Sequence, residues 1–129
     1  MEKYKLLDQR RVTSEDNGEQ KSVRVPEWVS ALSAKTAAIY LQVHEVDDDT
    51  RITVGAVHTA NPDSGQFPFD TDWFDSGTES GVDIGLFHES EDVSGVDQLL
   101  LVPSIGLRPG GSGTDKSAVI SLWLILKPF

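Results

Sequence analysis

The chain has 129 residues, of which 21 are acidic and 11 are basic, so its formal net charge at pH 7 is −10. This length suits one domain with one buried core. The absence of cysteine excludes disulfides, thiolate zinc sites and cysteine nucleophiles. Because its average surface is acidic, the protein repels the phosphates of nucleic acids and anionic lipids. We therefore expect neither a nucleic acid nor a membrane as its partner.

Nothing in the chain resembles a targeting segment. Residues 1–5 lack the apolar core of a signal peptide. The longest apolar run, residues 119–126, is interrupted by Ser121 and is far shorter than the roughly 20 residues that a membrane helix needs. The sequence therefore predicts a protein that is made and assembled in the cytoplasm, without secretion by a signal peptide.

The N-terminal residues 1–22 form the first unit of the chain. Residues 3–7 and 21–25 are strand candidates, and Asp16-Asn17-Gly18 between them favours a turn. We expect residues 1–22 to be an N-terminal arm or first strand, followed by a β-sandwich domain over residues 23–129.

Residues 26–32 carry the strongest helical signal in the chain. Trp28 and Leu32 are four residues apart, and Pro26 suits a first helical turn. One or two helical turns are predicted there.

The clearest strand signals lie in residues 36–46 and 50–60. In the first run Ile39, Leu41 and Val43 alternate with polar or aromatic residues, and the second run alternates in the same way. The acidic residues 47–49 separate the two runs by a short polar turn. This pattern predicts a β-hairpin.

Short strands and turns fill the rest of the chain. Residues 61–72 have the composition of a loop, and the glycine-rich residues 106–115 that of a flexible tip. Further strands are predicted at residues 73–75, 82–88, 98–102 and 117–127. Seven or eight short strands with almost no helix predict an all-β fold, namely an antiparallel, jelly-roll-like β-sandwich with at most one short helical turn.

The last strand is apolar on both faces. One face carries four aliphatic side chains and the other carries Val119, Trp123 and Ile125, with Ser121 as the single polar residue. A strand of an antiparallel sandwich normally has one solvated face. Either the chain itself covers both faces of this strand, or the outer face contacts another subunit. Since obligate interfaces resemble a core cut in half, we expect Val119, Trp123 and Ile125 to lie at a subunit interface of a homo-oligomer.

The basic start of the chain contrasts with its acidic remainder. Lys3, Lys5, Arg10 and Arg11 lie in the first eleven residues, whereas residues 52–107 contain no Lys or Arg. The N-terminal segment is expected to act as a clasp that adds Tyr4, Leu6 and Leu7 to a neighbouring subunit. Folding back on the chain's own acidic face and remaining a disordered tail are the alternatives. The acidic middle itself is either a solvated face or a docking face for a basic partner.

No residue pattern indicates catalysis. The three histidines, His44, His58 and His88, lack the spacing of a helical zinc site, and no serine lies in a G-x-S-x-G turn. Asp115 stands where a phosphate loop needs glycine before its lysine, so nucleotide binding is not expected. The sequence therefore predicts a protein that is not an enzyme and needs no cofactor.

A binding module is the alternative function. Residues 67–75 contain three aromatic side chains besides Trp73, and aromatic rings can stack on sugars. Asp70, Asp72 and Asp75 in the same segment are potential Ca²⁺ ligands, although their spacing is not that of an EF-hand. A carbohydrate- or calcium-binding site in a loop at residues 67–75 is therefore kept as an alternative.

The order of elements resembles small β-sandwich structural proteins of tailed phages and phage-like particles. The resemblance covers residues 23–129 and rests on a strand like residues 36–43, a second strand like residues 52–57, the segment Asp72-Trp73-Phe74-Asp75 and a terminal strand like residues 118–127. It implies a head or tail accessory protein or a capsid decoration protein. Such a protein has no catalytic activity, contacts copies of itself and other particle proteins, and is located in the virion after assembly in the host cytoplasm.

Overall fold

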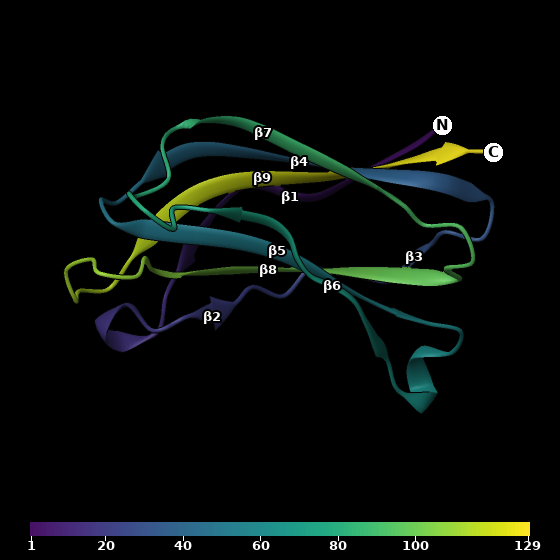
Figure 1. Ribbon diagram of the computed structural model, residues 1–129, viewed down its shortest axis with the longest axis horizontal. Helices are drawn as coiled ribbons and strands as arrows, with labels where there is room; N and C mark the ends of the chain where they lie inside the picture. The colour runs from purple at the N-terminus through teal and green to yellow at the C-terminus, as the bar shows by residue number, and fades with distance from the viewer.

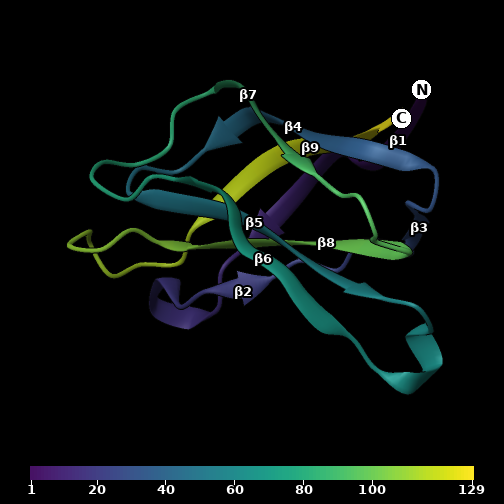
Figure 2. The same ribbon diagram turned by 45° about the vertical axis from the view of Figure 1, so that its right-hand side comes forward.

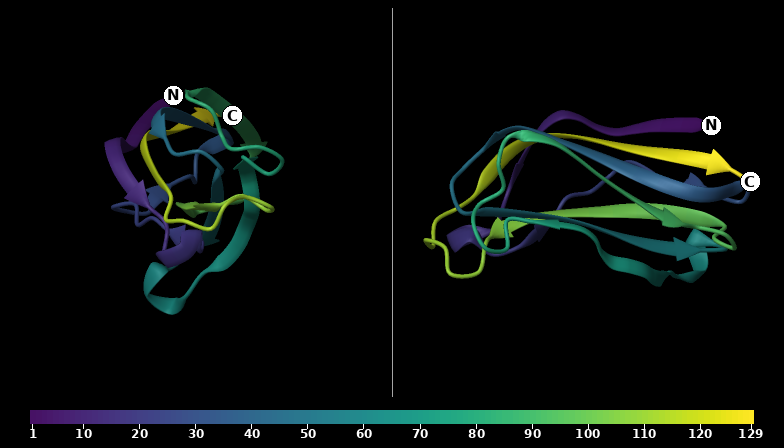
Figure 3. Two further views of the ribbon diagram at one scale, coloured as in Figure 1. Left: turned by 90° about the vertical axis from the view of Figure 1, so that its left-hand side faces the viewer. Right: turned by 45° about the horizontal axis from the view of Figure 1, so that its top comes forward.

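The computed structural model describes residues 1–129 as two antiparallel β-sheets packed face to face (Figures 1 and 3). The strands are β1 (Glu2–Thr13), β2 (Lys21–Ser22), β3 (Val29–Ser30), β4 (Ala34–Val46), β5 (Thr50–Thr59), β6 (Phe67–Ser76), β7 (Gly85–Asp92), β8 (Gln98–Leu107) and β9 (Ser117–Pro128). Two 3-10 turns, η1 (Asp16–Gly18) and η2 (Pro62–Ser64), are the only helical elements. The expected antiparallel, jelly-roll-like β-sandwich is confirmed.

Sheet A contains four strands in the order β1-β9-β4-β7. Its central strands β9 and β4 direct alternate side chains into the core, because successive residues of a strand point to opposite faces. The inward row is almost completely buried and consists of Ile39, Leu41, Val43, Ile120, Leu122 and Leu124. The two chain termini lie at the same end of this sheet (Figure 1).

Sheet B has the order β2-β8-β5-β6, and the short β3 also pairs with β8. Ile52, Val54, Leu99 and Leu101 are among its inward side chains, and they join those of sheet A in one cluster of 27 buried residues. The β5–β6 end with η2 extends away from sheet A (Figure 2). No helix of the structure has the length and apolar character needed to cross a membrane.

The prediction of a hairpin between residues 36–46 and 50–60 is wrong. β4 belongs to sheet A, whereas β5 belongs to sheet B and pairs with β6 and β8. Residues 47–49 therefore form a corner between the two sheets. Both arrangements bury the same alternate side chains, so alternation identifies the strands and not their pairing.

The prediction of a helical turn at residues 26–32 is also wrong. Val29 is buried and lies opposite Leu99 as part of the β3–β8 pair. Leu32, which helical spacing assigns to the same face as Trp28, is 70% exposed. The spacing of Trp28 and Leu32 therefore does not indicate a buried helical face. Pairing of β3 with β8 supplies the backbone hydrogen bonds instead.

Residues 67–75 form most of β6 rather than a loop. The register of β6 on β5 shifts beside Gly55, where residues 71–73 bulge opposite this one glycine. A Cβ atom at Gly55 would lie 2.9 Å from the carbonyl oxygen of Thr71. The absence of a side chain at this position lets the bulged strand approach β5 closely.

Candidate interaction surface

The outer face of sheet A carries the apolar residues that the sequence places at an interface. Val119, Trp123 and Ile125 lie on β9, a central strand, and all three are partly exposed while the residues between them are buried. No layer of the chain covers this side of sheet A (Figure 3). The sequence predicts that one face of this strand is buried and that its outer face is apolar. The observed burial of the β9 residues agrees with this.

A row of side chains crosses this outer face from edge to edge. The register places Lys5, Trp123, Tyr40 and His88 opposite one another on β1, β9, β4 and β7. The ammonium of Lys5 lies 5.3 Å from the centre of the Trp123 ring. The Tyr40 and His88 rings are stacked, with centroids 5.1 Å apart and planes 28° apart. Aromatic groups of three neighbouring strands thus lie in one row across the sheet.

Leu86 extends the apolar character of this face to its edge strand. It lies on β7 opposite Gln42, on the same face as Tyr40 and His88, and is 62% exposed. Large apolar side chains that lie together on a surface are typical of an interaction site. We call Val119, Trp123, Ile125, Tyr40, His88 and Leu86 the sheet A patch.

Ser121 interrupts the sheet A patch in the middle of β9. Its Oγ accepts a hydrogen bond from the backbone N–H of Gln9 at 2.9 Å and lies 2.9 Å from Nε2 of His44. Gln9 has a φ of 44° at a bulge of β1, which brings its N–H over the face of the sheet. These contacts bury Ser121, so Val119 is separated from Trp123.

Tyr4, Leu6 and Leu7 lie in β1, which pairs with β9 of the same chain. Leu6 and Leu7 are buried in the core at 7% and 4% exposure, and the partly buried Tyr4 packs against that core. β1 is thus an edge strand of sheet A. We therefore do not include Leu6 and Leu7 in the interface proposed below, because their own chain already covers them.

The aromatic residues of β6 are divided between the core and the surface. Trp73 and Phe74 are buried, and Phe74 contacts Phe87 of β7 at a centroid distance of 5.6 Å. Phe67 is 64% exposed and lies 5.8 Å from the His58 ring. Among the aromatic side chains of residues 67–75 that could stack on a sugar, only Phe67 and the partly buried Phe69 are accessible.

The acidic residues of β6 make contacts within the chain. Arg51 donates from Nε and Nη2 to the two carboxylate oxygens of Asp75 at 2.9 and 2.6 Å, and this pairing lowers the pKa of Asp75. Asp70 accepts from the backbone N–H of Asp72. No group of three or more His, Asp or Glu side chains is arranged to hold a metal ion.

The carboxyl group of Glu91 in β7 has a strongly raised pKa. Burial raises its pKa to about 7, together with a hydrogen bond to Asp70 and the negative charges of Asp70 and Glu89. This pair connects β7 of sheet A with β6 of sheet B across the side of the sandwich. The protonated form of Glu91 therefore suits the contact between the two sheets.

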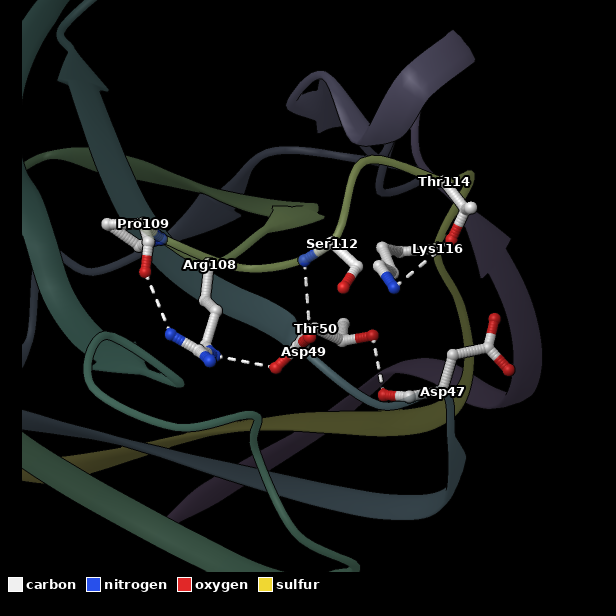
Figure 4. Close-up of polar contacts among 8 residues, drawn as sticks. All are labelled: Asp47, Asp49, Thr50, Arg108, Pro109, Ser112, Thr114 and Lys116. Atoms are coloured by element: carbon white, nitrogen blue, oxygen red, sulfur yellow. Dashed lines mark hydrogen bonds and ion pairs between the residues drawn. The ribbon is translucent and has the colours of Figure 1, made fainter.

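The glycine-rich residues 106–115 before β9 form hydrogen bonds with the corner between β4 and β5 (Figure 4). Asp49 accepts hydrogen bonds from Nε of Arg108 at 2.7 Å and from the backbone N–H of Ser112 at 3.2 Å, and these contacts lower its pKa. Asp47 accepts from the backbone N–H of Ser117 at 2.9 Å. The segment expected to be a flexible tip is thus held at both ends.

The three histidines do not form one site. His44 and His88 lie on the outer face of sheet A, where His44 bonds Ser121 and His88 stacks on Tyr40, and His58 lies in sheet B. The sequence does not predict Tyr40, His88 and Leu86 as members of the patch. Alternation within each strand indicates which residues share a face. Only the register between strands shows that these residues lie beside Trp123.

Comparison with known proteins gives a fold and no family. No protein-family model and no curated protein matches the chain. The VP2 subviral particle of infectious bursal disease virus superposes with a TM-score of 0.61 at 12% identity, over 95% of this chain and 31% of that chain. T=1 particles derived from the same virus give 0.52 at 11% identity, over 95% and 30%. A carbohydrate-binding module, TmCBM61 in complex with β-1,4-galactotriose, gives 0.49 at 8% identity, over 91% and 69%.

The likeness to the two particle structures supports the β-sandwich fold. The two particle structures come from infectious bursal disease virus rather than from a tailed phage. The chain spans less than a third of the length of the matched chain in each of these two particle structures. It therefore has the fold of one part of such a protein.

Proposed function

We propose that this protein is a non-catalytic structural component of a phage-type particle, either a capsid decoration protein or a head or tail accessory protein. It assembles with copies of itself and with other particle proteins through the sheet A patch. The observation that carries this proposal is the partly exposed, apolar outer face of a central strand, β9, on which no further layer of the chain packs.

Two properties of the patch support assembly rather than a solvated surface. Trp123, Tyr40 and Ile125 offer large apolar area at low entropic cost, and aromatic residues are enriched in interface centres. Lys5, which lies over Trp123, and the edge strands supply a charged rim around them. The β-sandwich shared with particle proteins adds a fold that is suited to such assemblies.

Light scattering after size-exclusion chromatography tests this function. The wild-type protein is expected to form a defined oligomer, and Trp123→Glu is expected to shift it to smaller folded species. Leu32→Glu is the matched control, because Leu32 is 70% exposed and lies outside sheet A. A monomeric wild-type protein, or an unchanged Trp123→Glu oligomer, would overturn the proposal.

Carbohydrate binding by β6 is the second candidate, and the exposure of Phe67 beside His58 favours it. Phe67→Ala is expected to abolish any binding of soluble polysaccharides in affinity electrophoresis, whereas Trp123→Glu leaves that binding intact. Because the two variants lie on different sheets, the experiment separates the candidates. Retention of the polysaccharide by Phe67→Ala would exclude this site.

A further inference from the structure

Sheet A ends in two long strands that each pair on one side only. β1 pairs with β9, and β7 pairs with β4. The successive residues 88–90 of β7 are all exposed, as are Arg10 and Arg11 of β1, which follow the bulge at Gln9. Since successive side chains point to opposite faces, neither face is covered at these points. The unpaired N–H and C=O groups of such edges are a template for a further strand.

The directions of the two edge strands allow one to pair with the other between copies. All strand pairs of sheet A are antiparallel, and the sheet has four strands. β1 and β7 therefore run in opposite directions. If two copies lie side by side in the same orientation, β1 of one copy is antiparallel to β7 of the next, which is the pairing found throughout this sheet.

The charges of the two edges distinguish this arrangement from its alternatives. β1 carries four basic and two acidic residues, whereas β7 carries three acidic residues and neither Lys nor Arg. Lys5 and Arg11 already pair with Asp8 and Glu45, but Lys3 and Arg10 make no ion pair within the chain. Pairing of β1 with β1, or of β7 with β7, places like charges together and is disfavoured. Pairing of β1 with β7 joins opposite charges.

We propose that sheet A continues from one copy of the chain into the next, through antiparallel pairing of the β1 edge of one copy with the β7 edge of its neighbour. This inference rests on the proposed function, to which it adds a second contact of a different kind. A contact between two different surfaces of the same protein generates a ring if the rotation closes and a filament if it does not. The sheet A patch of successive copies would then form one surface.

Reversal of charge at each edge tests the pairing. The β1 variant is Lys3→Glu with Arg10→Glu, and the β7 variant is Glu89→Lys with Ser90→Lys. The control, Asp63→Lys with Glu79→Lys, changes exposed charges outside sheet A. Sedimentation velocity is expected to show that each edge variant alone associates at least about tenfold more weakly than the wild type. The control is expected to associate like the wild type.

An equimolar mixture of the two edge variants provides the decisive measurement. Each β1 edge of one variant is then complementary to the β7 edge of the other, so the mixture is expected to regain the wild-type assembly in alternating order. Backbone amides of β7 should become protected from hydrogen exchange in the mixture and not in the separate variants. This recovery also shows that both variants are folded.

The outcomes separate this inference from the proposed function. If Trp123→Glu dissociates the oligomer while both edge variants assemble like the wild type, the edge pairing is overturned and the patch contact stands. If the edge variants dissociate and their mixture does not recover, the pairing of β1 with β7 is likewise overturned. A wild-type protein that is monomeric at sub-millimolar concentration overturns both.

Discussion

The Nε2 atom of His44 lies 2.9 Å from Oγ of Ser121 on the outer face of sheet A. His44 belongs to β4 and Ser121 to β9, and the same Oγ accepts the backbone N–H of Gln9 in β1. One buried hydroxyl therefore connects three neighbouring strands. It also explains why the single polar residue of an otherwise apolar strand is needed at this position.

Replacement of Ser121 by alanine is expected to destabilise the protein by about 1–3 kcal/mol, because the Gln9 N–H and the His44 ring lose a buried partner. Urea denaturation measures the difference from the wild-type free energy of unfolding. Ser90→Ala is the control, since Ser90 is exposed on β7 of the same sheet. Equal loss of stability in both variants would show that the buried hydrogen bonds of Ser121 are not responsible.

The fold class could be predicted from the sequence because alternation reports burial directly. Ile120, Leu122 and Leu124 lie in the core, and Val119, Trp123 and Ile125 on the outer face, as their spacing indicates. Alternation contains no information on which strands pair. Alternation therefore predicts a hairpin for β4 and β5, although a corner between the two sheets buries the same residues.

The candidate site could be predicted only in part for the same reason. Trp123 was identified from its own strand, but Tyr40 and His88 join it through the register of β4 on β9 and of β7 on β4. That register depends on contacts between segments far apart in the sequence. The bulge of β1 at Gln9 and the bulge of β6 opposite Gly55 likewise have no local signature in the sequence.

Stability is expected to decrease as the pH rises through the range from about 4.5 to 7. The folded state raises the pKa of Glu91 from the usual 4.5 to about 7, so the folded chain retains a proton that the unfolded chain loses. This stabilisation is complete below the pKa that Glu91 has in the unfolded chain. It is lost as the pH rises through the pKa that Glu91 has in the folded chain. Urea denaturation at several pH values measures this slope.

Glu91→Gln is expected to flatten the pH dependence in this window, because glutamine stays neutral. Asp49, Asp75 and Asp92 have lowered pKa values and contribute the opposite slope below pH 3.8, outside the window. Glu79→Gln, an exposed acid outside the strands, is the control. An unchanged slope in Glu91→Gln would assign the effect to another group.

Gly55→Ala is expected to destabilise the protein by about 1–3 kcal/mol, because overpacking a fixed backbone forces strands apart. The new Cβ would lie 2.9 Å from the carbonyl oxygen of Thr71 and 3.2 Å from that of Asp70, and neither is a flexible side chain. Thermal unfolding followed by circular dichroism measures the loss. Gly113→Ala, with no atom within 4 Å of its Cβ position, should unfold like the wild type.

Removal of residues 1–11 distinguishes an integral strand from a clasp. The deletion removes most of β1 and with it Leu6 and Leu7, whose burial stabilises the fold by about 1.5–3 kcal/mol each. It also exposes the edge of β9, an apolar strand. The truncated chain is therefore expected to lose cooperative thermal unfolding and to aggregate. A clasp that reaches a neighbouring subunit would instead leave a folded, soluble monomer with the wild-type circular dichroism spectrum, and that result would contradict the placement of β1 in its own sandwich.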